Sequence, residues 1–223
     1  MKNKHDSKKT VPTATETKKR FPWWIIAVSV VAVAAIAVGA IFLLQPADKP
    51  KTSYQEVAET FVEAYYLRDR NTQFSLTFYN ARQQWIDTAI ADNGSEEAFF
   101  AEAQKQADDR GIDAKVTGFD SYFDAYHQFY LTDAKNVYGE YTVTVQMTDS
   151  KKLDDALLND YREKQLDAID PKYIDADAFN AVTEAYLLTV NLHVAGEKKD
   201  LNENYLVYVV YHNDQWLVVS HSA

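Results

Sequence analysis

Residues 207–221 read VYVVYHNDQWLVVSH, and this stretch decides the fold of the chain. It contains two apolar runs separated by Asn213 and Asp214, and a two-residue connection of this kind is typical of a β-hairpin. The pattern predicts one strand over 205–212 and a second over 215–221. The chain is therefore expected to close with an antiparallel pair of strands.

The side chains on the two faces of this hairpin indicate what surrounds it. Pairing across the turn sets Tyr211 opposite Trp216 and Val209 opposite Val218, which are favourable cross-strand pairs on one face. The other face carries four more apolar side chains: Tyr208, Val210, Leu217 and Val219. Because both faces are apolar near the turn, we expect the hairpin to be covered on both sides or to line a pocket.

The sequence upstream predicts further strands and three helices. Alternation with a period of two predicts strands over 138–147 and 186–194. Apolar residues at helical spacing predict a helix of about four turns that is capped by Ser53. The same spacing predicts a second helix over 72–92 and a third over 95–110.

Two segments fit more than one assignment. Residues 115–131 mix Val, Thr, Phe and Tyr, which favours one or two strands, although their aromatic side chains also fit one face of a helix. Those side chains are Tyr122, Phe123, Tyr126, Phe129 and Tyr130. Residues 150–184 favour a helical insertion that is interrupted at Pro171. Helices followed by a curved antiparallel sheet make the predicted domain α+β.

Charge divides the chain into three regions. Residues 1–20 carry seven basic and two acidic groups, residues 21–44 carry no charge, and residues 45–223 carry 16 basic and 31 acidic groups. As a helix, the apolar residues 23–44 would span about 33 Å, which matches the hydrocarbon core of a bilayer. The positive charge before this segment predicts a cytoplasmic basic tail (1–20), a single transmembrane helix (21–44) and an extracytoplasmic domain at the cell membrane.

A cleaved signal peptide is the alternative interpretation of the apolar segment, because residues 38–40 (VGA) resemble a cleavage site. The apolar run continues through residues 41–44, beyond that site, which favours an uncleaved anchor. Residues 45–52 are a linker with two prolines that block helix continuation. In both interpretations the domain over 53–223 lies on the extracytoplasmic side of the membrane.

Composition argues against several functional classes. The net charge of −15 over residues 45–223 does not favour contact with a phosphate backbone, so we expect no nucleic-acid partner. The absence of cysteine excludes disulfides, thiolate metal sites and cysteine nucleophiles. The acidic cluster of Asp167, Asp170, Asp175 and Asp177 lacks the glycine and the last carboxylate of an EF-hand loop. We therefore expect neither a metal nor a cofactor.

Two stretches resemble the nuclear-transport-factor-two-like superfamily, a group of cystatin-like α+β domains. Residues 54–78 (YQEVAETFVEAYYLRDRNTQFSLTF) resemble its first helix, and residues 207–221 resemble its last hairpin. The resemblance implies a cone in which about three helices pack on a curved sheet; a cystatin-like sheet wrapped on one helix is the alternative. The chain also looks like the membrane-anchored extracytoplasmic subunits of type IV secretion systems and Gram-positive conjugation systems.

Enzymes of this superfamily place an acid or a base inside the cone. The resemblance therefore draws attention to His193, His212 and His221, with Tyr208 or Asp120 as possible partners. Because His212 borders the turn and His221 lies two residues from the C-terminus, we expect both side chains to be solvated. We accordingly expect no catalytic role for them.

The tyrosines are the most distinctive feature of the outer domain, since all 15 follow the apolar segment. Tyrosine and tryptophan are favoured at protein interfaces and in ligand clefts. The candidate ligand or interface residues are Tyr122, Tyr126, Tyr130, Tyr208, His212 and Trp216. We predict a non-enzymatic binding or assembly module that contacts envelope, secretion or conjugation proteins, or a second copy of itself. A receptor that holds a small ligand or glycan in the cone is the alternative.

Overall fold

The computed structural model describes residues 53–223, apart from the side chains of residues 165–168, 176 and 179. The predicted basic tail (1–20), transmembrane helix (21–44) and linker (45–52) lie outside the described residues. Over residues 53–223, no helix combines the length and the apolar character that crossing a membrane requires.

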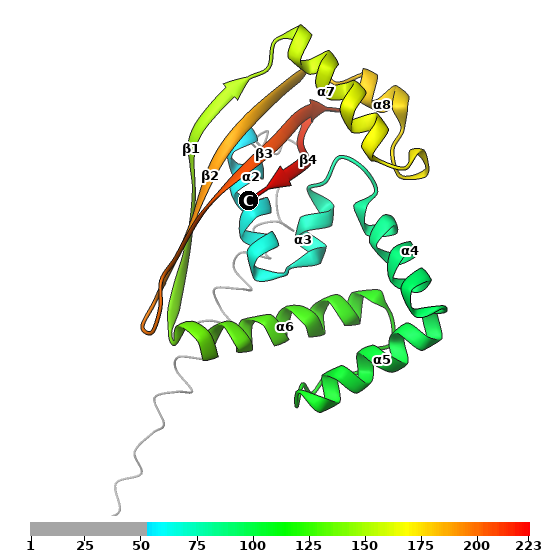
Figure 1. Cartoon of the computed structure of the whole chain (residues 1–223), viewed down its shortest axis with the longest axis vertical. Helices are drawn as coiled ribbons and strands as arrows, with labels where there is room; N and C mark the ends of the chain where they lie inside the picture. The colour runs from blue at the N-terminus through cyan, green and yellow to red at the C-terminus, as the bar shows by residue number, and fades with distance from the viewer. Residues whose placement is uncertain (1–52) are drawn as a thin grey trace, which may run out of the picture. The chain divides into compact units, whose positions relative to one another are not determined.

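The domain is α+β, as the sequence predicts, and is built on one four-stranded antiparallel sheet in the order β1-β2-β3-β4. The strands are β1 (Tyr141–Lys152), β2 (Glu184–Gly196), β3 (Leu201–His212) and β4 (Gln215–Ser222). Figure 1 shows that the first three strands are long and bend together, so that the sheet curves. Successive strands are neighbours, which makes the sheet a meander.

The predicted hairpin is confirmed with its register. Tyr211 pairs with Trp216 and Val209 pairs with Val218. The two turn residues, Asn213 and Asp214, have φ angles of 49° and 64°. Positive φ at both central residues defines the type I′ turn, and Asn and Asp are among the residues that tolerate it best.

Helix α2 (Tyr54–Leu67) packs on one face of the sheet and forms the main core with it. The helix is capped by Ser53, whose side chain accepts a hydrogen bond from the Glu56 amide at 3.1 Å. Apolar side chains of α2 meet those of β2, β3 and β4 in a core that is almost free of solvent: Val57, Ala58, Phe61, Val62, Leu188, Val190, Leu192, Val207, Val209 and Val218. The predicted helix of about four turns is thus confirmed.

The prediction of a single helix over 72–92 is wrong, because the structure has two helices there. They are α3 (Arg70–Ser75) and α4 (Ala81–Asn93). Between them, the chain runs along the outer edge of β4. The Val218 amide donates to the Leu76 carbonyl and the Phe78 amide donates to the Val218 carbonyl, both at 2.8 Å. Since an edge strand leaves backbone groups unpaired, these two bonds stabilise the break in the helix.

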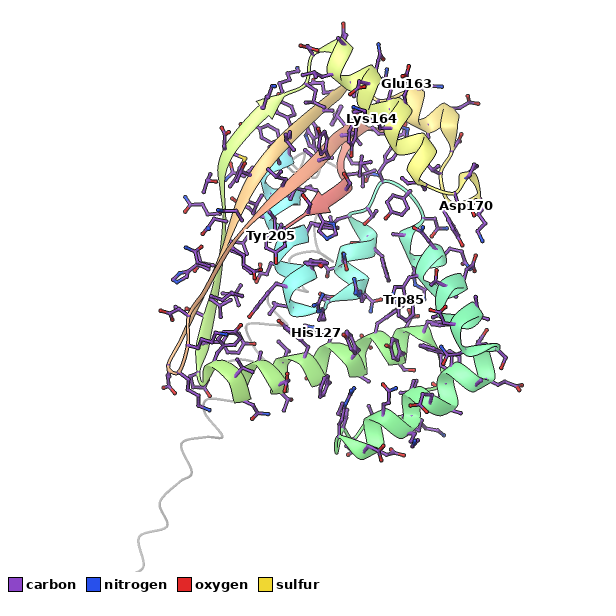
Figure 2. All side chains as sticks on the ribbon, viewed as in Figure 1. Trp85, His127, Glu163, Lys164, Asp170 and Tyr205 are labelled. Atoms are coloured by element: carbon purple, nitrogen blue, oxygen red, sulfur yellow. The ribbon has the colours of Figure 1, made fainter. Side chains whose placement is uncertain are left out.

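Helix α5 (Glu96–Asp109) begins after Ser95, as predicted, and is followed by α6 (Phe119–Tyr138). The strand assignment over 115–131 is therefore wrong, and the helical alternative is right. Aromatic side chains at helical spacing place Phe123 in a buried cluster with Phe74 and Trp85. Because α6 continues to Tyr138, the next strand begins at Tyr141 and not at residue 138 as predicted. Its His127 ring lies 2.7 Å from the Leu67 carbonyl at the end of α2 (Figure 2).

The predicted insertion is helical, although β1 extends into it as far as Lys152. It contains α7 (Asp155–Ala168), the short 3-10 helix η1 (Pro171–Tyr173) and α8 (Ala176–Asn180), which lie at one end of the sheet in Figure 1. A second core forms where the insertion meets the hairpin face that carries Val210, Leu217 and Val219. Both faces of the hairpin are therefore covered, as its two apolar faces predict.

Candidate functional site

A cavity of about 700 Å³ lies beside the edge strand β4. Its walls come from α2, α3, α4, the segment between α7 and η1, and the last residues of β4. The lining combines aromatic and polar side chains: Phe61, Arg70, Gln73, Phe74, Thr77, Tyr79, Gln84, Trp85, Thr88, Asp92, Asn93, Ser220 and His221. Cavities of roughly 300–1,000 Å³ with this mixture are typical of small-molecule sites.

A β-bulge at Val219 sets which face of the sheet receives the next two residues, Ser220 and His221, which line the cavity. Tyr208 pairs with Ser220 while the adjacent Val209 pairs with Val218, which leaves Val219 as an extra residue. Because side chains alternate along a strand, one extra residue reverses the faces of all later ones. The His221 ring consequently faces α2, where it lies 5.0 Å from the ring of Phe61 and 4.4 Å from that of Tyr65.

Among the residues that line the cavity, Arg70 is the one with a basic side chain of the lysine or arginine type. Gln73 holds this side chain in position. Arg70 begins α3, and its Nη1 donates to Oε1 of the buried Gln73 at 2.6 Å. Burial lowers the pKa of Arg70, and the neighbouring Arg68 guanidinium lowers it further. An arginine nevertheless keeps its proton in a protein, so the cavity contains a positive charge.

His221 is half-buried in the cavity wall, so the expectation that it is solvated is wrong. Burial lowers its pKa below the ordinary value, and the Arg70 guanidinium lowers it further. The imidazole is therefore neutral at pH 7, with one nitrogen that donates and one that accepts.

The aromatic wall is backed by a layer of further rings. Trp85, on α4 in Figure 2, lies 5.0 Å from Phe123 and stacks on Tyr122 with ring centroids 5.5 Å apart. Phe74 meets the same Phe123 ring at 5.5 Å. Rings locked against one another hold their positions, so this side of the cavity is pre-formed.

Three of the predicted site residues lie on α6 and do not line the cavity. Tyr122 and Tyr126 line a much smaller hollow of about 20 Å³ beside α5, and both are close enough to Arg70 to influence its pKa. Tyr130 meets Tyr66 edge-on at 5.7 Å, and the Arg68 guanidinium lies 5.6 Å from the centre of its ring.

The other three predicted site residues lie on the hairpin and are not gathered at one place. Tyr208 stacks on Tyr161 of the insertion at 3.9 Å, in the second core. His212 is half-buried, with its ring centroid 5.3 Å from that of Phe78, so it is less solvated than predicted. Trp216 belongs to an aromatic group near the turn, described below.

The three histidines singled out in the sequence do not come together. His193 is exposed and pairs with Asn202, near the end of the sheet opposite the hairpin turn. Asp120 instead binds Arg82, with the nitrogen and oxygen 2.7 Å apart. Among the side chains that the structure describes, no histidine has a carboxylate within 4.0 Å, and no group of three potential metal ligands is found.

The structure brings to the cavity three residues that were not predicted from the sequence: Arg70, Gln73 and Ser220. Arg70 follows the first helix in a strongly acidic domain, and that contrast is the one signal in the sequence that points to it. Comparison of the chain with protein-family models, with curated proteins and with solved structures finds no match.

Proposed function

We propose that this chain is a membrane-anchored, non-enzymatic binding protein whose outer domain holds a small ligand in the cavity beside β4. The observation that carries the proposal is the cavity itself, which has about 700 Å³ and both aromatic and polar walls. The anchor rests on the apolar residues 23–44 and the basic residues before them. The extracytoplasmic location follows from the same charge pattern.

The nuclear-transport-factor-two-like cone is part of this proposal. It is supported by the resemblance of residues 54–78 and 207–221, and by a curved antiparallel sheet with α2 packed on one face. In such a cone, a ligand site between the sheet and the helices is the expected place for binding. A cavity beside β4, α2 and α3 supports this part of the proposal.

A ligand screen with a blocked cavity tests the proposal. We expect a panel of monosaccharides, amino acids and organic acids to yield a binder of the full-length chain, detected by saturation-transfer NMR. Ala81→Phe adds a ring to the cavity wall and is expected to weaken that binder at least about 10-fold through steric exclusion. Ala91→Phe, on an exposed position of the same helix, is the matched control and should bind normally.

Two results would contradict this function. The first is the failure of every compound to bind the folded protein. The second is a set of binders that Ala81→Phe leaves unaffected, while circular dichroism confirms that the variant is folded. In the second case the ligand would occupy some other part of the chain.

A second candidate function, assembly with an envelope protein or a second copy, is favoured by the aromatic group at the hairpin turn. Tyr54 stacks on Tyr186 with centroids 4.3 Å apart, and Trp216 meets both rings at 5.5 Å. Tyr211 joins the group at 5.0 Å from Trp216. All four side chains remain partly exposed, and aromatic surfaces of this kind are common at the centres of interfaces.

For assembly we expect that crosslinking of the full-length chain in native membranes recovers a defined partner, and that Trp216→Lys reduces the recovery several-fold. The charge would have to be desolvated inside the interface, which is costly. Leu206→Lys, at a position 45 % exposed on the neighbouring strand, is the control. Recovery of the chain alone, or equal loss with both variants, would argue against assembly through this surface. Tyr208 is unsuitable for this test because it is stacked in the second core.

A further inference from the structure

The arginines of the domain differ in how their charges are compensated. Of the five arginines in the part of the chain that the structure describes, Arg82 is the one with a carboxylate within 4.0 Å. Arg68 and Arg110 lie over aromatic rings, and Arg162 binds a carbonyl and an amide oxygen. Arg70 is the arginine that lines the large cavity.

The charge of Arg70 is also poorly offset by its surroundings. Its hydrogen-bond acceptor is the neutral amide oxygen of Gln73, and the adjacent Arg68 repels it. The acidic residue of the cavity lining, Asp92, is exposed and is not within 4.0 Å of the guanidinium. A partly buried cation without a counter-ion is unfavourable, and an anion bound in the cavity would relieve that cost.

The domain carries 31 acidic and 16 basic groups over residues 45–223, so carboxylates are abundant in it. Arg82 pairs with one of these carboxylates, that of Asp120. Arg70 is instead held by Gln73 on the wall of a cavity that could admit a ligand. The cavity thus keeps a positive charge apart from the negative charge of the protein.

We propose that the ligand of this cavity bears a carboxylate and that Arg70 binds it. The inference rests on the proposed ligand-binding function and names the chemical class of the ligand. The planar guanidinium matches a carboxylate, to which it can donate two parallel hydrogen bonds. Gln73 uses its amide oxygen to hold Arg70, which leaves its amide nitrogen as a further donor on the wall.

The other walls define the body of the ligand. Phe74 and Trp85 provide flat apolar surfaces, and the neutral His221 adds one donor and one acceptor. Such surfaces accept either the face of a sugar ring or an aromatic ring. An acidic sugar and an aromatic carboxylic acid share this chemistry, and both are included as probes.

The test uses two matched pairs of probes with the full-length chain: D-glucuronate against D-glucose, and phenylacetate against phenylacetamide. We expect at least one carboxylate to bind about 10-fold or more tightly than its neutral counterpart, because bonds to charged groups are the stronger ones. Arg70→Met should remove this preference, and Arg70→Lys should keep part of it. Arg110→Met is the control, since Arg110 lies over Phe129 and away from the cavity. The pair that shows the preference identifies whether the ligand is an acidic sugar or an aromatic acid.

A second measurement uses the unaltered protein and does not depend on the folding of a variant. Burial lowers the pKa of His221 most, and the Arg70 charge lowers it further; a carboxylate beside Arg70 offsets that second contribution. The pKa of His221, followed by proton NMR, should therefore rise when the carboxylate binds and should stay unchanged with the neutral counterpart.

The outcomes separate the two proposals. Equal binding of both members of each pair, unaffected by Arg70→Met, would overturn the carboxylate proposal and leave the cavity as a binding site. Carboxylate binding that Ala81→Phe does not weaken, or that leaves the pKa of His221 unchanged, would also overturn it. If none of the four probes binds while neutral compounds in the wider screen do, the carboxylate proposal fails alone. If nothing binds in either experiment, both proposals fail.

Discussion

Replacing Phe123 by alanine is expected to lower the free energy of unfolding by about 3–5 kcal/mol, the usual range for a buried phenylalanine. The Phe123 side chain is 1 % exposed and lies where α3, α4 and α6 meet. Its ring contacts Phe74 at 5.5 Å and Trp85 at 5.0 Å, and the Arg82 guanidinium lies 5.9 Å from its centre. Removing the ring leaves a void that these elements cannot fill without moving.

Equilibrium urea denaturation, followed by circular dichroism, measures this loss. Val137→Ala is the matched control, because Val137 lies on the same helix and is 44 % exposed; we expect it to change stability by no more than about 0.5 kcal/mol. The Phe123 variant should also bind any cavity ligand more weakly, since Phe74 and Trp85 form the cavity wall. A loss below about 1 kcal/mol would mean that α6 is not packed as described.

Replacing Gly196 by alanine is expected to cost about 1–3 kcal/mol through overpacking. A Cβ atom at this position would lie 2.7 Å from the carbonyl oxygens of Lys199 and Tyr138, and 2.8 Å from the Tyr138 Cβ. Two of these contacts are with backbone, which cannot rotate away as a side chain can. The Tyr138 carbonyl is moreover held by the Lys198 amide at 2.9 Å, so relief of the clash would break that bond.

Gly118→Ala is the control for this second variant. Nothing lies within 4 Å of a Cβ placed on Gly118, and its backbone is extended, a conformation that any residue adopts. The change should therefore stay within about 1 kcal/mol, the scale of an N-cap substitution. If the Gly196 and Gly118 variants unfold at similar temperatures, the turn between β2 and β3 does not lie as close to the end of α6 as the structure has it.

Local sequence pattern is enough to specify helix α2 but not helix α6. Helix α2 has an N-cap, a single apolar face and no competing signal, and it forms as predicted. Helix α6 has aromatic residues, which favour strands by propensity and also fit a helical face by spacing. Packing decided between the two, since only a helix sets Phe123 against Phe74 and Trp85 while His127 contacts the end of α2.

The candidate site depended more strongly on tertiary structure than the fold did. The sequence pointed to tyrosines on α6 and on the hairpin, whereas the cavity is lined by α3, α4 and the end of β4. The break between α3 and α4 exists because Leu76 and Phe78 pair with the edge of β4. A pairing partner about 140 residues away leaves no local trace in residues 72–92, which otherwise have helical spacing.

By itself, the sequence determined the α+β class, the hairpin with its two-residue turn and the register beside it, and the helical character of residues 150–184. These features follow from period, turn chemistry and apolar patterning, which act over a few neighbouring residues. The tertiary structure alone decided which face of the sheet receives His221, because the bulge at Val219 reverses the alternation. It also decided that Arg70 lies on a cavity wall with Gln73 in place of a carboxylate, since that depends on how separate helices meet the edge of the sheet.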